Sequence, residues 1–248
     1  MATCLNIGSM TAGRDATNGK ENATIVSIHN RTRARVFFEL VVAYWLILIV
    51  CWTPRPWQKL LWWVAAATIV IFTIASFDGL KAMGLRPANF FRSLWVAGVA
   101  LLLAILAVLM AFQLYTLRVP GTAPLFIQTF WAYALWAAVQ QFLLQCFFLA
   151  RLLRLIPNAK FAAFMAAVIF SLAHLPSPIL TSVTLIWGVA ACLVFLRYRN
   201  LYPLAIAHAI FGITIAITIP GSVDHNMRVG RGYLTYGHTH KPPKLPQP

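Results

Sequence analysis

Five polar side chains lie inside long apolar stretches of the sequence, and their types allow hydrogen-bonding or acid–base chemistry. Three are the amides of Gln140, Gln141 and Gln145, and two are the imidazoles of His174 and His208. A charged side chain at membrane depth costs roughly 2.5 to 3.5 kcal/mol, so ionisable and strongly polar groups there need a reason. An imidazole can exchange a proton near neutral pH, whereas an amide can only hold water or an oxyanion by hydrogen bonds.

The three glutamines predict two polar faces on a single helix. Gln141 and Gln145 are four residues apart and share a face, whereas Gln140 is offset by about 100° around the axis. Amides in membrane helices can also serve only as interhelical hydrogen bonds, each worth about 0.6 to 2 kcal/mol. Both interpretations stay open for the glutamines taken alone.

The two histidines lie in different local settings. His174 precedes the break at Pro176-Ser177-Pro178, where an imidazole could simply bond a carbonyl left unpaired at a helix end. His208 is flanked by alanines that let another helix approach closely, which favours a site. Helix rise places His174 about 21 Å and His208 about 10 Å from the inner boundary. The two rings can therefore meet only if helices tilt or break.

The elements that carry these residues are predicted from composition. Of the 248 residues 60% are hydrophobic and 10% are charged, too little polar surface to cover a soluble globule. In hydrocarbon a helix satisfies its own backbone hydrogen bonds, so the apolar runs predict an all-α, polytopic transmembrane helical bundle of about seven spans. The runs cover residues 36–52, 57–77, 94–115, 125–150, 161–175, 179–196 and 201–219. The fifth is short for a full crossing, at about 22 Å.

Positive charge follows the connections between the runs. With seven spans and a cytoplasmic N-terminus, thirteen of the twenty Lys and Arg fall on cytoplasmic segments and three on outer loops, with four in the C-terminal tail. The net charge of +15 is thus explained by topology rather than by a nucleic-acid partner. We predict a multi-pass protein of the cell membrane, with membrane lipids as partners and no nucleic acid.

The chain divides into three parts. Residues 1–35 predict a disordered cytoplasmic arm, residues 36–220 the transmembrane domain with its core at 125–220, and residues 221–248 an irregular, polar and Pro-rich tail. Glu39, near Arg35, predicts an interfacial ion pair. The four cysteines form no CxxC pair, and Asp224-His225-Asn226 lacks the regular spacing of a metal site. No cofactor is predicted, and the sequence does not exclude a metal ion.

Three motifs, taken in order, resemble those of the CPBP family, the CAAX-processing and bacteriocin-processing intramembrane proteases. The family's first motif is a Glu-Glu pair, three intervening residues and an Arg, and here it aligns with glutamine at all three positions, 140, 141 and 145. The second, Phe followed four residues later by His, is intact at Phe170 and His174. The third begins at His208 but ends at Gly212 in place of a polar residue.

The resemblance implies a CPBP-like fold and, as a hypothesis, hydrolysis of a peptide bond inside the membrane by His174, His208, Gln140 and Gln141. Gln145 and Phe170 would support them. Glutamine cannot act as the general base, and loss of such a base typically costs 10²- to 10⁴-fold in rate. The substrate would be a membrane-anchored or prenylated peptide.

Two other functions remain open. In the first, the chain is a pseudoenzyme whose cavity binds a peptide, a lipid tail or a partner transmembrane helix without cutting it. In the second, His174 and His208 ligate one haem for electron transfer.

Overall fold

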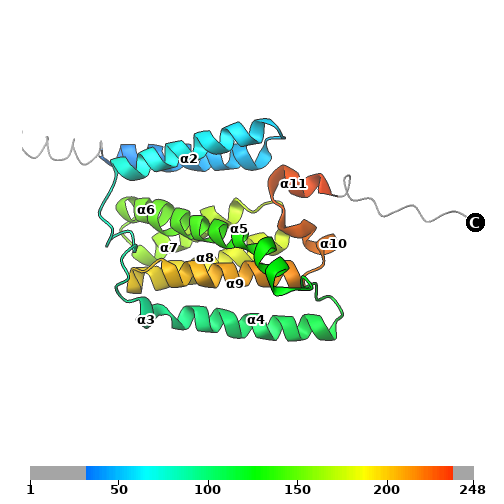
Figure 1. The fold of residues 1–248 in the computed structure, drawn as a ribbon. Helices are drawn as coiled ribbons and strands as arrows, with labels where there is room; N and C mark the ends of the chain where they lie inside the picture. The colour runs from blue at the N-terminus through cyan, green and yellow to red at the C-terminus, as the bar shows by residue number, and fades with distance from the viewer. Residues whose placement is uncertain (1–31, 237–248) are drawn as a thin grey trace, which may run out of the picture.

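The fold, obtained as a computed structural model, is described for residues 32–236 and consists of helices and their connections (Figure 1). The predicted disorder of residues 1–31 and the Pro-rich end at 237–248 lie outside the described residues. The first helix, Thr32–Trp52, begins before the predicted boundary at residue 36. The elements that follow are α2 (Trp57–Ala75), α3 (Phe90–Ser93), α4 (Trp95–Gln113), α5 (Ala123–Phe142), the π-helical segment η1 (Leu143–Leu149), α6 (Ala150–Leu155), α7 (Ala159–Leu172), α8 (Pro178–Tyr198), α9 (Tyr202–Thr218), α10 (Gly221–Asp224), η2 (His225–Met227) and α11 (Gly230–Leu234).

The long helices match the predicted apolar runs. Five helical stretches of the described chain are long and apolar enough to cross a membrane: the first helix, α2, α3 with α4, α5 to α6, and α8. A sixth candidate is α9 together with the segment after it, which bends by 112° at the break. Helix α7, with 14 residues, is apolar but shorter, as its run predicted. The predicted all-α polytopic bundle is confirmed.

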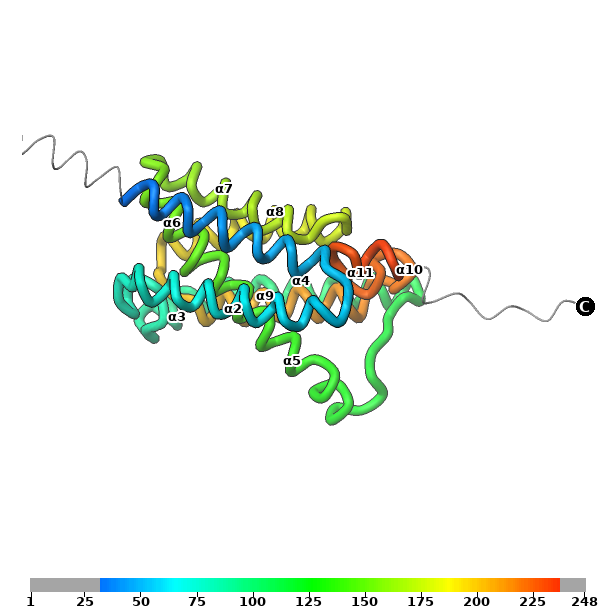
Figure 2. Tube along the Cα trace, turned by 90° about the horizontal axis from the view of Figure 1, so that it is seen from above, coloured from blue at the N-terminus to red at the C-terminus, as the bar shows by residue number. Residues whose placement is uncertain are grey.

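The long helices form three groups and, except for α5, which runs obliquely in Figure 2, lie roughly parallel or antiparallel (Figures 1 and 2). The first helix and α2 form a hairpin on one side, α4 covers the opposite side, and α5 to α9 lie between them. Helix α7 packs against α8, and α9 packs against both α4 and α5. Four alanines of α7, at positions 162, 163, 166 and 167, are fully buried, because small side chains allow close helix packing.

Local sequence explains where the central helices begin. Thr122 starts α5, Asn158 starts α7 and Ser177 starts α8, each by accepting a backbone N–H of the first turn with its side-chain oxygen. Proline in the first turn of α5 and α8 removes an N–H that has no helical partner there. These helices therefore start at residues that the sequence itself specifies.

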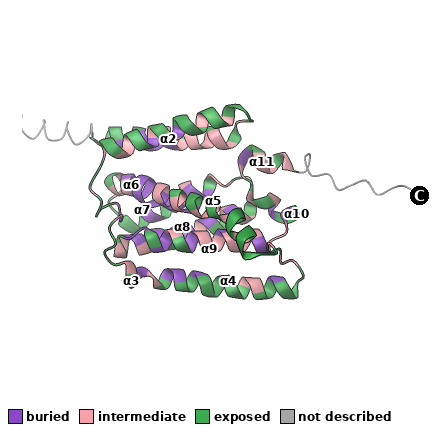
Figure 3. Ribbon diagram, in the orientation of Figure 1, coloured by how far each residue is buried: buried purple, intermediate pink, exposed green. Residues whose placement is uncertain are grey.

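The outer helices expose most of their apolar side chains (Figure 3). On α2, Ile71 and Ile74 are 63% and 71% exposed, and on α4 Met110 and Phe112 are both 65% exposed. The closest packing lies instead around η1, where Leu144, Phe147 and Leu149 are fully buried. Exposed apolar faces around a packed centre are what a helical bundle presents to lipid.

Long-range contacts define the two ends of the bundle, which are called inner and outer after the predicted topology. At the inner end, Arg33 donates to the Leu155 carbonyl at 3.0 Å, and Asn200 donates to the Ala88 carbonyl at 2.8 Å. At the outer end, the Arg118 backbone N–H donates to Ile217 and that of Gly230 to Leu175, both at 2.8 Å. Each end thus gathers the loops that the predicted topology assigns to one side.

The segment after α9 is more ordered than predicted. Residues 221–234 were expected to be irregular but form α10, η2 and α11. Gly230 anchors this segment beside the first helix: its φ is +55°, and a Cβ there would lie 2.2 Å from the Cys51 carbonyl oxygen. Only glycine accommodates both the left-handed backbone and that approach, so the expectation was wrong because tertiary packing orders the segment.

Candidate functional site

The glutamines lie where one long helix changes its winding. Helix α5 ends at Phe142 and continues as η1, a π-helical turn of the kind frequently found at functional sites. Gln141 and Gln145 flank this transition and are both fully buried, whereas Gln140 is half-buried. The Gln145 side-chain N–H donates to Gln141 Oε1 at 3.3 Å, so the two amides share a face as the spacing predicted.

Gln141 connects this helix to α9. Because Gln141 Oε1 accepts from Gln145, its Nε2 is turned toward His208 Nδ1, 2.9 Å away. An amide N–H can only donate, so Nδ1 is the acceptor and the proton of the neutral His208 ring resides on Nε2. His208 is 5% exposed. The result is a buried hydrogen-bond chain from Gln145 through Gln141 to His208.

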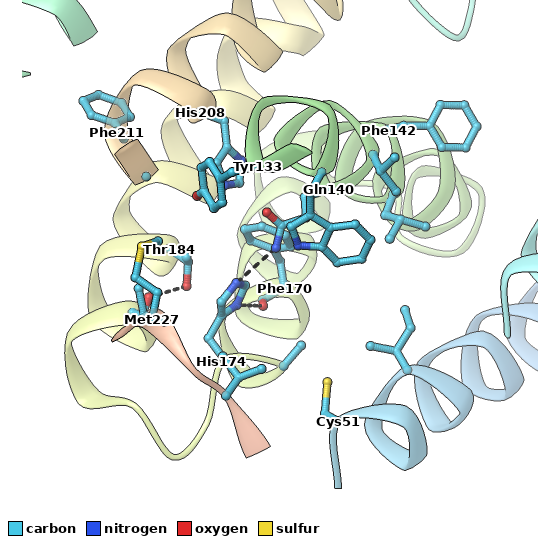
Figure 4. Close-up of a pocket in the computed structure, with 18 of the residues that line it drawn as sticks. Cys51, Tyr133, Gln140, Phe142, Phe170, His174, Thr184, His208, Phe211 and Met227 are labelled. Atoms are coloured by element: carbon cyan, nitrogen blue, oxygen red, sulfur yellow. Dashed lines mark hydrogen bonds between the residues drawn. The ribbon is translucent and has the colours of Figure 1, made fainter. Parts of the chain in front are cut away.

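His174 is held from its own helix and faces Gln140. Helix α7 ends at Leu172, and His174 Nδ1 lies 2.9 Å from the carbonyl oxygen of Phe170, one turn back (Figure 4). A carbonyl only accepts, so Nδ1 carries the proton and Nε2 has a free lone pair. Gln140 Nε2 approaches that lone pair at 3.5 Å, a long contact.

The Phe170 ring lies between the two imidazoles. Its centroid is 5.0 Å from that of His174 and 6.0 Å from that of His208, edge to face in both cases. The two imidazoles thus lie close to one ring despite the difference in depth expected from helix rise. The structure brings together Gln140, Gln141, Gln145, Phe170, His174 and His208, whose functional roles remain predictions.

A cavity of about 690 Å³ opens beside this cluster, and its lining comes from the first helix, α2, α5, α7, α8, α9 and the segment after α9. Gln140, Phe170, His174 and His208 line it (Figure 4), whereas Gln141 and Gln145 are not among its lining residues. Most of the other lining side chains are apolar, and no Asp, Glu, Lys or Arg of the described residues is among them. The site is thus a large apolar cavity with one neutral polar wall.

Sequence reasoning did not single out Tyr133. A Cβ at Gly212 would lie 1.6 Å from the Tyr133 hydroxyl oxygen, so the tyrosine occupies the space that any larger residue at 212 would need. Tyr133 lines the cavity near His208 (Figure 4). Two signals could have found it: Tyr133 lies seven residues before Gln140 on the same helix face, and Gly212 interrupts an apolar helix.

Two smaller predictions concern the acidic side chains outside the cavity. Arg35 does pair with Glu39, at 2.9 Å, and Glu39 is also buried within the protein, where Arg151 binds it at 2.9 Å. Across residues 32–236 no three His, Cys, Asp or Glu side chains are grouped closely enough to hold a metal ion, and this includes the region of Asp224.

Comparisons with known proteins agree with the motifs. Residues 122–214 match the family model described as Rce1-like, type II CAAX prenyl endopeptidase Rce1-like. The match runs from the cap of α5 into α9 and contains all five polar residues of the cluster. Comparisons with curated proteins and with solved structures gave no match.

The fold defines a class of protein, a multi-pass helical membrane protein. Residues 122–214, less than half of the chain, are similar to this CAAX prenyl endopeptidase family, in agreement with the resemblance of the motifs.

Proposed function

We propose that this protein binds the apolar chain of a membrane-anchored peptide or lipid in its cavity and does not hydrolyse it. The observation that carries this proposal is the neutral lining: the 690 Å³ cavity has no carboxylate among its described residues. Apolar cavities with a few oriented polar groups are typical binding sites for small or chain-like ligands. A prenylated peptide, a lipid tail or a partner transmembrane helix fits that description.

The hydrogen bonds of the two imidazoles support binding over catalysis. A neutral imidazole has one basic nitrogen. In His208 this nitrogen, Nδ1, accepts from Gln141, and in His174 it is Nε2, which faces the Gln140 amide. Each basic lone pair is therefore directed at a glutamine N–H, which is 2.9 Å away in His208 and 3.5 Å away in His174.

The carboxylates of the described chain are engaged elsewhere. Glu39 pairs with Arg151, Asp78 pairs with Arg154, and Asp224 accepts the backbone N–H of Asn226. A hydrolase of this type needs a group that takes a proton from water and returns it to the leaving amine. None of these three carboxylates lines the cavity.

The test is a binding and cleavage assay on the protein reconstituted in lipid vesicles. A photoactivatable prenylated peptide should crosslink to the wild type and remain uncut. Ala66→Phe, on α2 within the cavity lining, should reduce crosslinking, whereas Ala67→Phe, on the same helix but exposed and outside the lining, should not. Turnover of the peptide by the wild type would refute the binding-only proposal.

A second candidate, slow peptide hydrolysis, has one observation in its favour. The Phe170 carbonyl fixes the proton of His174 on Nδ1 and so directs the basic Nε2 toward the cavity, which is the tautomer that a general base needs. On this hypothesis the wild type cleaves the peptide and His174→Ala abolishes cleavage. If neither protein cleaves any membrane-anchored peptide, hydrolysis is excluded for those substrates.

We further propose a location in the cell membrane with the N-terminus in the cytoplasm. The support is that Lys and Arg are concentrated in the loops of the inner end. Cytoplasmic loops of membrane proteins carry such an excess of Lys and Arg. An impermeant thiol reagent applied to intact cells should label Thr122→Cys, in the outer loop, and should spare Asn89→Cys, in an inner loop. The opposite labelling would reverse the orientation.

A further inference from the structure

A second cavity lies at the inner end of the bundle, between the end of α2, the loop that follows it and the η1–α6 region. Its volume is about 200 Å³, and three arginines line it, Arg151, Arg154 and Arg199, against a single carboxylate, Asp78. At about 30 Å³ per water molecule this space equals about six or seven waters, enough for one phosphate group. It is separate in position and in chemistry from the apolar cavity.

The three arginines are not equally satisfied. The Arg151 guanidinium makes four hydrogen bonds, two to Glu39 and one each to the carbonyls of Phe147 and Phe72. Arg154 uses Nη2 for Asp78 and for the Ser76 carbonyl. Its charge also repels that of Arg151.

Arg199 differs from both. No carboxylate of residues 32–236 forms an ion pair with it, and its guanidinium is near the Cys146 thiol, another residue of the lining. Because Glu39 pairs with Arg151 and Asp78 pairs with Arg154, Arg199 is the lining arginine whose charge no carboxylate of residues 32–236 compensates. An anion in the cavity would balance it.

The surroundings suit a membrane anion. The cavity is at the loop-bearing inner end, where Lys and Arg gather, and beside it the last turns of α2 and the residues after them expose Ile71, Ile74 and Phe77 by 63%, 71% and 54%. Basic pockets between helices on the cytoplasmic side bind lipid head groups, while exposed apolar helix faces accept acyl chains. The two features are adjacent here.

We propose that this cavity binds a phosphate-bearing anion, with Arg199 and the free nitrogens of Arg154 as the ligating groups. Guanidinium and phosphate form short, charge-assisted and frequently bidentate hydrogen bonds, which an ammonium group does not match. The phosphate can come from the head group of an anionic phospholipid or from a soluble phosphate compound. The proposal does not depend on what the apolar cavity binds.

The test measures binding of a fluorescent short-chain phosphatidic acid to the full-length protein in phosphatidylcholine nanodiscs. Arg199→Gln should weaken binding about fivefold, the loss expected for one membrane-surface cation, and Arg154→Gln with Arg199→Gln about thirtyfold. Arg197→Gln, two residues away and exposed but outside the cavity, is the matched control and should bind as the wild type does. Elution of each variant as a single species on gel filtration checks folding.

Competition separates the two sources of phosphate. If inorganic phosphate or glycerol phosphate displaces the probe, the site takes soluble phosphates; if only unlabelled phosphatidic acid does so, it takes lipid head groups. Equal weakening by Arg197→Gln, or unchanged binding by the double variant, overturns the proposal, because surface charge alone would then explain the affinity. Ala66→Phe should leave this binding intact whatever its effect on the apolar cavity.

Discussion

The ionic cluster at the inner end and the neutral cluster beside the cavity both bury polar groups, but by different means. In the first, the Glu39 and Arg151 side chains are only 3% and 4% exposed and neutralise each other across 112 residues of sequence. In the second, Gln141, Gln145 and the neutral His208 are similarly buried but carry no charge. Buried charge needs a fixed partner, whereas a neutral amide chain needs only donors and acceptors in sequence.

This difference bears on function. A carboxylate at position 140 would line a cavity with no cation among its described lining residues, and one at position 141 would be buried beside His208. Glutamine keeps the hydrogen-bond geometry and removes the need for a counter-charge, at the expense of the general base. The neutral wall is therefore compatible with an apolar ligand that enters and leaves without ionic bonds.

The largest expected effect is in the ionic cluster. Glu39→Ala leaves Arg151 buried without its carboxylate and should lower the free energy of unfolding by about 3 to 5 kcal/mol. Denaturation in mixed detergent micelles, followed by circular dichroism, gives the measurement. Asp78→Ala, which removes the half-exposed pair with Arg154, is the control and should cost less than about 1 kcal/mol. Equal losses would mean that the Glu39 pair is no stronger than a surface pair.

In the neutral cluster Gln141→Leu should lower the free energy of unfolding by about 2 kcal/mol. The change leaves His208 Nδ1 and the Gln145 amide without their partners in a buried setting. The same detergent titration measures it. A loss as large as that of Glu39→Ala would contradict the distinction between the ionic and neutral clusters.

A smaller loss is expected at the contact between α9 and α5. Gly212→Ala forces the Tyr133 ring to move, since the new Cβ would overlap its hydroxyl, and should cost about 1 kcal/mol after the gain in helix propensity. Tyr133→Ala should remove that penalty in a double-mutant cycle. If the losses in the free energy of unfolding of the two variants are additive, the position of the Tyr133 ring does not require glycine at 212.

The smallest effect belongs to Gln140→Leu. Its contact with His174 is 3.5 Å long and only partly buried, compared with 2.9 Å for Gln141 and His208. We expect a change in the free energy of unfolding of less than about 0.5 kcal/mol. Measuring Gln140→Leu and Gln141→Leu in one denaturation series compares the two hydrogen bonds directly. Equal losses in the free energy of unfolding would mean that the Gln140–His174 contact is as strong as the Gln141–His208 hydrogen bond.

Much of the fold follows from sequence, but parts of the site do not. The spacing of Gln141 and Gln145 predicts their shared face, and the helix end before Pro176 predicts that the His174 imidazole can bond an unpaired carbonyl. Nothing local, however, indicates that α5 becomes a π-helix at Leu143 or that Tyr133 fills the space at Gly212. These features depend on neighbouring helices, so interpretation of one segment at a time misses them.

The sequence by itself determined the apolar helices, their order and the loops that carry positive charge, because backbone hydrogen bonding in hydrocarbon and the charge of each loop are properties of single segments. Only the tertiary structure decided that Arg151 pairs with Glu39 and that His174 and His208 flank Phe170. Those contacts join residues on separate helices, and their geometry is set by how the helices pack rather than by spacing along the chain.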